Sequence, residues 1–309
     1  MTHQERELLL IEHPRFQAVF SRQGGQLLSA PVQASDDPAA LGVQDLVVIA
    51  VKGPALGAVA ERIGPLIGPH TLLLPAMNGV PWWFAAGAPA LGSAPLASID
   101  PGGRIASALP LSQVIGCVVH ASTFTSAPGL VEHKMGQGLI VGSAQPTPGG
   151  DARLQTVAAL LANAGFAVTL SERIQREVWF KLWGNMTMNP ISALTGATCD
   201  RILDDPLVRG FVSAIMLEAK AIGARIGIPI DQSPEDRHAV TRKLGSFKTS
   251  MLQDVEAGRP IELDALVGAV REIGQHLIEP TPNMDALMGL TRLMGQMRGL
   301  YPEPTKTPQ

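Results

Sequence analysis

A line of polar side chains runs along an otherwise apolar stretch in the second half of the chain. Lys181, Asn185 and Asn189 follow one another at intervals of four residues. Ser192 returns near the same direction, so that on a helix all four side chains project within a sector of roughly 80°. An ammonium and two carboxamides on a buried helix need polar partners, because an unpaired buried polar group costs about 1–3 kcal/mol. A polar ligand in a cleft would supply them, whereas the simpler alternative is a solvated ion pair between Lys181 and Glu177, one turn earlier.

Continuous apolar runs in the first half of the chain are typical of strands that are buried on both faces of a sheet. We expect strands at residues 45–51, 71–76, 114–119, 139–141 and 166–170, an extended pair or hairpin arm at 26–34, and a short apolar run at 8–11. Helical patterns lie between them at residues 55–67 and 151–164. This alternation predicts a parallel sheet with helices on both faces.

The second half of the chain has long helical patterns at residues 172–194, 206–226, 234–257, 261–277 and 284–298. Asp205 before Pro206 and Ser233 before Pro234 are typical of helix starts. The fold class is therefore α/β, with a parallel-sheet domain over residues 1–170 and an all-helical domain over residues 171–309.

Three polar residues follow the expected strands at their carboxyl ends, namely Lys52, Asn78 and His120. Ligands of open parallel sheets bind at this edge. Taken singly, the three residues are equally compatible with an exposed loop lysine, an Asn-Gly turn and a strand-end histidine. Together, facing the polar line of the helix at Lys181, they predict a cleft between the two domains.

Composition excludes several classes of function. The net charge is −3 with no basic cluster, so a nucleic-acid surface is not expected. No apolar window is long enough for a membrane span. Cys117 and Cys199 form neither a disulfide framework nor a metal pattern, which suits the cytoplasm. His70, His120 and His133 lack partners at ligand intervals, so no metal is expected.

The glycine-rich turn of a dinucleotide-binding fold is not found at its usual place. Gly136 and Gly138 resemble that fingerprint, but strand residues rather than a helix follow them. Glu12 ends the first apolar run as an acidic residue ends the second strand of such a fold, yet only eleven residues precede it. A strand, a turn and a helix need roughly 25–30 residues. We therefore expect the first βα unit to be missing and the natural chain to start further upstream.

Four segments carry a resemblance that covers nearly the whole chain: AVKGPAL at 50–56, MNG at 77–79, WFKLWGNMTMNPISALTG at 179–196 and SMLQDVEAGRPIELDAL at 250–266. In these segments the chain resembles the ketopantoate reductase (2-dehydropantoate 2-reductase) family. The resemblance implies a Rossmann-like NADP-binding domain, a helical domain for substrate binding and dimerisation, and an active site in the cleft between them. It also implies that NADPH reduces a small 2-keto acid there, and it leaves a homodimer open.

The resemblance also implies roles for individual residues. Lys181 matches the catalytic lysine of the family, and Asn185 and Asn189 match its substrate-contacting asparagines. Ser250 and Glu262, twelve residues apart, match the serine and the glutamate that hold the substrate. The chemistry suits these residue types, because hydride transfer to a ketone builds negative charge on oxygen, which an ammonium can stabilise and protonate. General acid catalysis of this kind contributes roughly 10²–10⁴-fold.

For Glu262 two alternatives remain: it accepts a hydrogen bond from a substrate hydroxyl and pairs with Lys181, or it is an ordinary first-turn glutamate favoured by the helix dipole. Lys52 and Asn78 match cleft residues beside the nicotinamide, and His120 joins them from the next strand end. Glu12 favours NAD, while Arg15 is placed to reach the 2′-phosphate of NADP, so both cofactors stay open.

Two departures from the family pattern concern the substrate. Phe247 stands where some members have a polar contact, and the pair Trp82–Trp83 indicates a bulkier or more apolar cleft wall. Three functions therefore remain: reduction of 2-dehydropantoate or a close analogue, a dehydrogenase for a different hydroxy acid, and a non-catalytic homologue that binds a ligand or dimerises.

Overall fold

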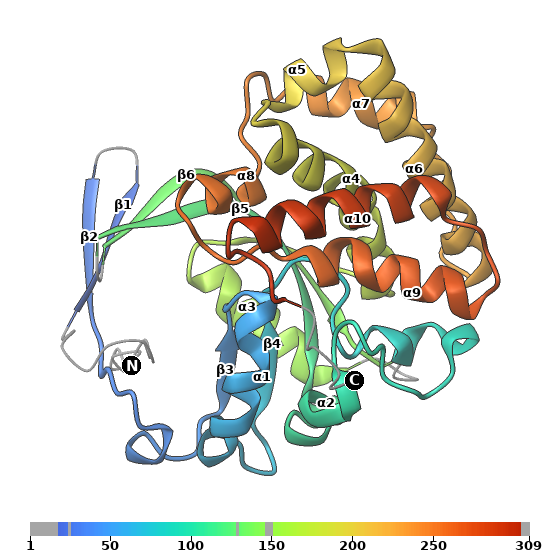
Figure 1. The fold of residues 1–309 in the computed structure, drawn as a ribbon. Helices are drawn as coiled ribbons and strands as arrows, with labels where there is room; N and C mark the ends of the chain where they lie inside the picture. Colours follow the sequence, from blue (N-terminus) through green and yellow to red (C-terminus); the bar gives the residue numbers. More distant parts are fainter. Residues whose placement is uncertain (1–17, 24–25, 128–129, 146–150, 304–309) are drawn as a thin grey trace.

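The computed structural model describes residues 18–23, 26–127, 130–145 and 151–303 (Figure 1). An α/β part comes first, and a helical part follows it, so the expected fold class is confirmed. The last strand, β7, is Ala167–Leu170, and the first helix of the helical part, α4, is Ile174–Thr195.

Two short parallel strands form one side of the sheet region. Strand β3 (Leu46–Ile49) pairs in parallel with β4 (Leu72–Pro75). A parallel bridge between Leu73 and Val114 joins β4 to the start of the next strand. Both strands are shorter than the apolar runs that predicted them, because the runs continue into the turns at which Lys52 and Asn78 lie.

The next two strands differ most from the expectation. Strand β5 (Ile115–Ala127) and strand β6 (Leu130–Ser143) form a long antiparallel pair, whereas short strands in a wholly parallel sheet were expected. Their far ends are mostly polar and only partly buried or exposed, so the apolar runs marked only the buried ends. Parallel pairing resumes between β6 and β7.

A second hairpin extends this pair away from the body of the molecule (Figure 1). Strands β1 (Ala18–Gln23) and β2 (Gln26–Pro31) are antiparallel, and β1 pairs in parallel with the start of β6. The expected hairpin arm at residues 26–34 is thus one strand of this hairpin.

The glycines at 136 and 138 lie within β6, as expected from the strand residues that follow them. Gly136 has φ +73°, and a Cβ there would lie 2.4 Å from the carbonyl oxygen of His120. The register of the pair shifts at this point, between His120 and Ser122. The glycine therefore serves a β-bulge, which favours a left-handed residue.

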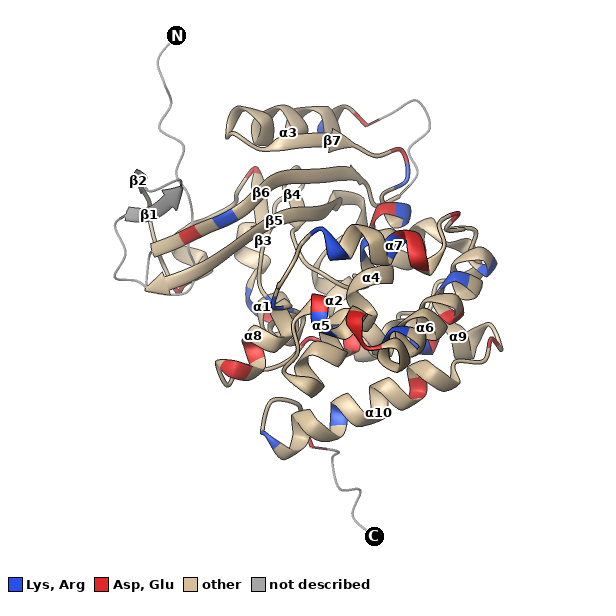
Figure 2. Cartoon of the chain, turned by 90° about the horizontal axis from the view of Figure 1, so that it is seen from above, with Lys and Arg blue, Asp and Glu red and all other residues tan. Residues whose placement is uncertain are grey.

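Helices cover both faces of the sheet region. Helix α3 (Ala152–Asn163) packs on the side chains of Leu74, Ile115 and Val141. Helix α1 (Gly53–Arg62) lies on the other face, in the cluster that contains Leu73. Figure 2 shows α3 and α1 on opposite sides of the strands, in agreement with the alternation of neighbouring side chains along β4. The short helix α2 (Arg104–Ala108) lies near α1.

The helical part contains α5 (Cys199–Asp204), α6 (Pro206–Arg225), α7 (Pro234–Arg242), α8 (Ser250–Glu256), a π-turn at Asp264–Gly268, α9 (Ala269–His276) and α10 (Pro282–Met297). The single helix expected at 234–257 is wrong. It is broken near Gly245, whose φ is +65°, and Thr249 caps the new helix α8 through a hydrogen bond from the Leu252 amide. Helix α5 was not expected. Among the described residues, no helix has the length and apolar character needed to cross a membrane.

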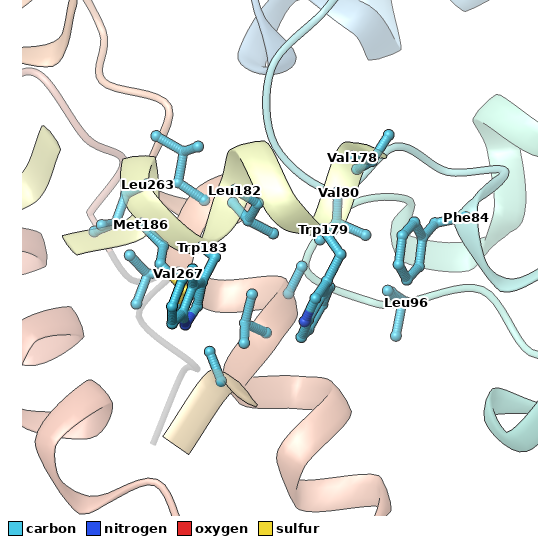
Figure 3. Close-up of a cluster of buried hydrophobic side chains, with 14 of the residues drawn as sticks. Val80, Phe84, Leu96, Val178, Trp179, Leu182, Trp183, Met186, Leu263 and Val267 are labelled. Carbon is cyan, nitrogen blue, oxygen red and sulfur yellow. The ribbon is translucent and has the colours of Figure 1, made fainter. Parts of the chain in front are cut away.

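Helix α4 is the central element of the molecule, and most of its side chains are buried. Figure 3 shows Trp179 and Trp183 of this helix among side chains from both halves of the chain. The ring of Trp179 stacks on Phe84 of the α/β part with a centroid distance of 5.8 Å. On another side, α4 packs against Val267 in the helical part. The polar line of the sequence therefore lies on a helix that both halves hold in place.

Gly223 on α6 provides a test of this packing. A Cβ at Gly223 would lie 2.5 Å from Nε1 of Trp179 and 2.8 Å from the Ile228 carbonyl oxygen. We expect Gly223→Ala to lower the free energy of unfolding by about 1–3 kcal/mol in urea titrations, because overpacking must move α6 or the indole. The matched control is Gly210→Ala on the same helix, where a Cβ would meet nothing within 4 Å. This control should raise stability by about 0.5–1 kcal/mol. Equal effects of both substitutions would contradict the packing.

Candidate active site

The ammonium group of Lys181 lies between α4 and the carboxyl ends of the strands. Its Nζ donates a hydrogen bond to Oδ1 of Asn78 at 2.7 Å and another to the carbonyl oxygen of Val119. Glu177 has a different partner, because its Oε1 accepts a hydrogen bond of 3.5 Å from Ser171. The alternative of a solvated pair between Lys181 and Glu177 is therefore wrong, and the lysine reaches across to the α/β part.

Burial sets the protonation of this lysine. It lowers the pKa of Lys181 from 10.5 to about 8, against the interactions with Cys117 and Glu262, which raise it. Burial likewise raises the pKa of the neighbouring Cys117 to about 11, so its thiol is neutral at physiological pH. A lysine with a pKa near 8 is protonated at neutral pH and can still give up its proton readily.

Glu262 approaches the same region just before the π-turn. It is 8% exposed, and its Oε1 accepts a hydrogen bond of 3.0 Å from the Gly53 amide at the start of α1. Burial raises the pKa of Glu262, although this amide and the charge of Lys52 act in the opposite direction. Among the described contacts, the carboxylate forms no ion pair with Lys181 and interacts with it only at longer range. The expected direct pairing is therefore not formed.

Lys52 connects the two halves of the chain. Its Nζ forms an ion pair with Oδ2 of Asp254 on α8, while Oδ1 of Asp254 accepts from Nε of Arg259 at 3.0 Å. The Asp254 side chain is only 2% exposed, so its two cationic partners compensate for its burial. Sequence reasoning missed Asp254 and Arg259, although both lie in the distinctive segment 250–266.

The remaining polar residues of α4 have different surroundings. Asn189 is buried and donates from Nδ2 to Oγ of Ser250 at 3.5 Å, which brings these two expected residues together. Asn185 lines a small cavity of about 10 Å³ with Lys181 and Asn78. Ser192 instead donates to the carbonyl oxygen of Ala197 at 2.6 Å, so it belongs to the end of the helix and not to the site.

A larger cavity of about 680 Å³ adjoins the small one, because Met77 and Asn78 line both. Its wall is mostly apolar and includes Glu262, Trp82, α1, α2 and residues 299–302. Trp83 was expected in the cleft wall as well, but it is 3% exposed and belongs to the core. The side chain of Phe247 also packs against the core and lines neither cavity. The site thus has a polar part at Lys181 and a roomy apolar part beside Glu262.

His120 was expected at a strand end, but β5 continues to Ala127, so the residue lies inside the strand. It is next to Val119, whose carbonyl oxygen accepts from Lys181. Partial desolvation, and then the charges of Lys181 and Arg237, lower the pKa of His120, although the residue remains exposed to solvent. Arg237 of α7 was not expected at this site. Glu12 and Arg15, the residues expected to choose between NAD and NADP, and the first apolar run at 8–11 lie outside the described residues. Within those residues, no group of three or more His, Cys, Asp and Glu side chains could hold a metal ion.

Comparisons with known proteins bear on this geometry. Residues 3–146 match the family model described as ketopantoate reductase PanE/ApbA, and residues 173–295 match the model of its C-terminal domain. The chain belongs to the ketopantoate reductase family. It is an oxidoreductase of the 2-dehydropantoate 2-reductase type, and reductases of this family take their hydride from NAD(P)H.

Individual relatives agree with this assignment. The chain is 40% identical over 281 residues to a 2-dehydropantoate 2-reductase of Mesorhizobium japonicum, covering 90% of this chain and 85% of that one. A crystal structure from Ralstonia solanacearum MolK2, with a provisional ketopantoate reductase description, is 56% identical with a TM-score of 0.87, over 92% of this chain and 86% of that one. The ternary structure of D-mandelate dehydrogenase with NADH and anilino(oxo)acetate shares the fold, with 18% identity, a TM-score of 0.76, and coverage of 91% and 86%.

The lowered pKa of Lys181 leads to a prediction about stability. Below pH 8 the lysine is protonated in both the folded and the unfolded chain, and its burial costs free energy. Between about pH 8 and pH 10.5 the folded chain loses the proton first, so the wild type gains stability as the pH rises. A Lys181→Met variant lacks this gain. We expect the stability of wild type relative to this variant to increase by about 2–3 kcal/mol across that window in urea titrations. A stability difference between wild type and Lys181→Met that does not change with pH would contradict the burial of a charged ammonium at this position.

Proposed function

We propose that this protein reduces a 2-keto acid, 2-dehydropantoate or a close analogue, with NADPH, and that Lys181 is the general acid. The observation that carries the proposal is the buried ammonium of Lys181, which is held by Asn78, just after β4, and by the Val119 carbonyl oxygen in β5. The 40% identity to a 2-dehydropantoate 2-reductase over 85% of its length supports the substrate class.

The lysine would act on the ketone oxygen. Negative charge develops there as the carbonyl carbon is reduced. A fixed ammonium in a water-poor site stabilises this charge without having to move during the reaction. With a pKa of about 8, Lys181 can then donate its proton to the alkoxide. Asn78 accepts from the ammonium and so fixes its direction, while the Val119 carbonyl oxygen remains as an acceptor for the second N–H.

Four further residues would hold the substrate. Asn189 and Ser250 already contact each other at 3.5 Å, so together they offer an amide donor and a hydroxyl to a substrate carboxylate or hydroxyl. Asn185 lines the small cavity beside Lys181 and is placed to orient the ketone. Glu262, assigned here as the second catalytic residue, is held by the Gly53 amide and keeps a second oxygen free to accept from a substrate hydroxyl.

The cofactor would bind across the strand ends. Lys52 and Asn78 follow β3 and β4, and His120 lies within β5 beside Val119, whose carbonyl oxygen accepts from Lys181. This region suits the nicotinamide half of a dinucleotide. When bound, NAD(P)H supplies the hydride. Arg15 and Glu12 remain our candidates for the ribose end, with NADP as the first choice and NAD as the second.

The same proposal includes the division into a cofactor domain over residues 1–170 and a helical substrate domain over 171–309. Strand β7 ends at Leu170 and α4 begins at Ile174, which supports that boundary. A ketopantoate reductase from Staphylococcus aureus that shares this fold at 20% identity is dimeric, and we propose a homodimer here as well. A cytoplasmic location stays a prediction from the two free cysteines, both of which are buried.

Kinetics of Lys181 variants test the assignment. We expect Lys181→Ala to lower kcat by roughly 10²–10⁴-fold, the usual contribution of a general acid. The wild-type rate should fall as the pH rises through about 8, because the ammonium loses its proton there. Lys243→Ala, which removes an exposed lysine at the end of α7, is the control and should leave both measurements unchanged. Full turnover by Lys181→Ala would refute the role of this lysine.

A dehydrogenase for a different, bulkier hydroxy acid is the second candidate, and the apolar cavity of about 680 Å³ favours it. We compare kcat/KM for 2-dehydropantoate and for a 2-keto acid with an aromatic substituent, in wild type and in Trp82→Ala. If the second candidate holds, wild type has the higher kcat/KM for the aromatic substrate. Trp82→Ala should then lower the ratio of the two kcat/KM values about tenfold, since Trp82 lines the cavity. Preference for 2-dehydropantoate in wild type would exclude the second candidate.

A further inference from the structure

Arg237 on α7 lies against the helix that carries Lys181 without an acidic partner. Its guanidinium carbon is 5.1 Å from the centroid of the Phe180 ring, and its Nε is buried without a hydrogen-bond partner. No ion pair found in the described part of the chain involves this arginine. The residue as a whole is half-buried, but a guanidinium whose Nε is buried in this way normally has an acceptor or an anion beside it.

Gly184 provides the space that the guanidinium occupies. A Cβ at Gly184 would lie 2.9 Å from Nε and 3.0 Å from Nη2 of Arg237. Phe180 and Gly184 are one helical turn apart, and Lys181 lies between them in the sequence. The guanidinium therefore rests on the same turn of α4 that carries Lys181, with an aromatic ring on one side and bare helix on the other.

The acidic side chains of these two helices have other partners. On α7, Asp236 accepts from the amide and the hydroxyl of Ser233. The charge of Glu235 acts on His238. On α4, Glu177 accepts from Ser171. The counter-ion of Arg237 is thus not found among its neighbours on these helices.

His120 relates this arginine to the candidate active site. The charges of Arg237 and Lys181 both lower the pKa of His120, after the effect of its burial. One imidazole within β5 therefore lies within electrostatic range of both cations. Burial lowers the pKa of Arg237 as well, but a guanidinium remains protonated in proteins.

We propose that Arg237 binds a carboxylate of the 2-keto acid, with Phe180 and Gly184 positioning the guanidinium for it. The inference rests on the proposed function and adds a specificity residue to it. A guanidinium presents a planar fork that matches the two oxygens of a carboxylate. In a 2-keto acid one carboxylate is bonded to the ketone carbon, and a dicarboxylic substrate carries a second one nearby. The phosphates of a dinucleotide are the other source of oxyanions, but a ribose separates them from the reacting ring.

The test compares charged and neutral substrates in three variants. Arg237→Met removes the guanidinium, Arg237→Lys keeps a charge without the fork, and Gly184→Ala keeps the arginine but displaces it. The dissociation constant of 2-dehydropantoate and of its neutral amide is measured by calorimetry with NADP⁺ present, and KM and kcat are measured separately. We expect Arg237→Met to weaken keto acid binding roughly 10–100-fold, with little change for the amide. Gly184→Ala should act in the same direction, and Arg237→Lys should restore part of the affinity.

Arg242→Met is the matched control. Arg242 is on the same helix, is exposed, and donates to Asp204 at 2.7 Å, so its loss should leave both dissociation constants unchanged. Circular dichroism and urea unfolding show which variants are folded. If Gly184→Ala does not fold, the two Arg237 variants still decide the question.

Two results would overturn the inference. One is a dissociation constant that is the same in wild type and in Arg237→Met for 2-dehydropantoate and for a dicarboxylic 2-keto acid alike. The other is a loss confined to the KM of NADPH, which would assign Arg237 to a cofactor phosphate. Loss with every 2-keto acid assigns Arg237 to the carboxylate beside the ketone, and loss confined to dicarboxylates assigns it to the second carboxylate. If wild type binds the keto acid through Arg237 but does not reduce it, the proposed function fails while the inference holds.

Discussion

The buried ammonium of Lys181 is the constraint on which the rest of the site depends. A protonated lysine in an apolar helix is costly, and the folded chain compensates for it with Asn78 at 2.7 Å and with the Val119 carbonyl oxygen. Both acceptors come from the α/β part, so α4 can satisfy its own polar side chain only when it is packed against the strand ends. The same burial lowers the pKa of the lysine to about 8, which makes the group chemically useful. Stability and reactivity therefore oppose each other at this residue.

Other polar contacts connect the two halves at the same place. The Gly53 amide at the start of α1 donates to Glu262 at 3.0 Å, and Lys52 forms an ion pair with Asp254 of α8. The Val80 amide donates to the Ala265 carbonyl oxygen at 2.8 Å. Between these contacts and the apolar packing of α4 lie the two adjoining cavities. The interface that holds the halves together is therefore also the wall of the candidate active site.

Sequence patterns succeeded where burial and periodicity are local properties. The continuous apolar runs predicted β3 and β4, and the 3.6-residue pattern predicted α4 and α6, within about two residues at each end. They failed where the exposure of side chains or a single backbone angle determines where a strand or a helix ends. The far ends of β5 and β6 are mostly polar and only partly buried or exposed, so no continuous apolar run marked them. The break between α7 and α8 depends on the left-handed backbone of Gly245 and on the cap at Thr249, and a periodicity count does not detect either.

In the candidate site, too, some features follow from the sequence and others only from the tertiary structure. The sequence by itself determined which side chains line one face of α4, because the interval of four residues is a property of the helix alone. It also indicated the polar residues at the strand ends. Only the tertiary structure decided the partners: Asn78 is 103 residues away from Lys181, Gly53 is 209 residues away from Glu262, and Arg237 reaches α4 from another helix. Partners this distant in sequence follow from how the layers pack, since no local rule of spacing brings them together.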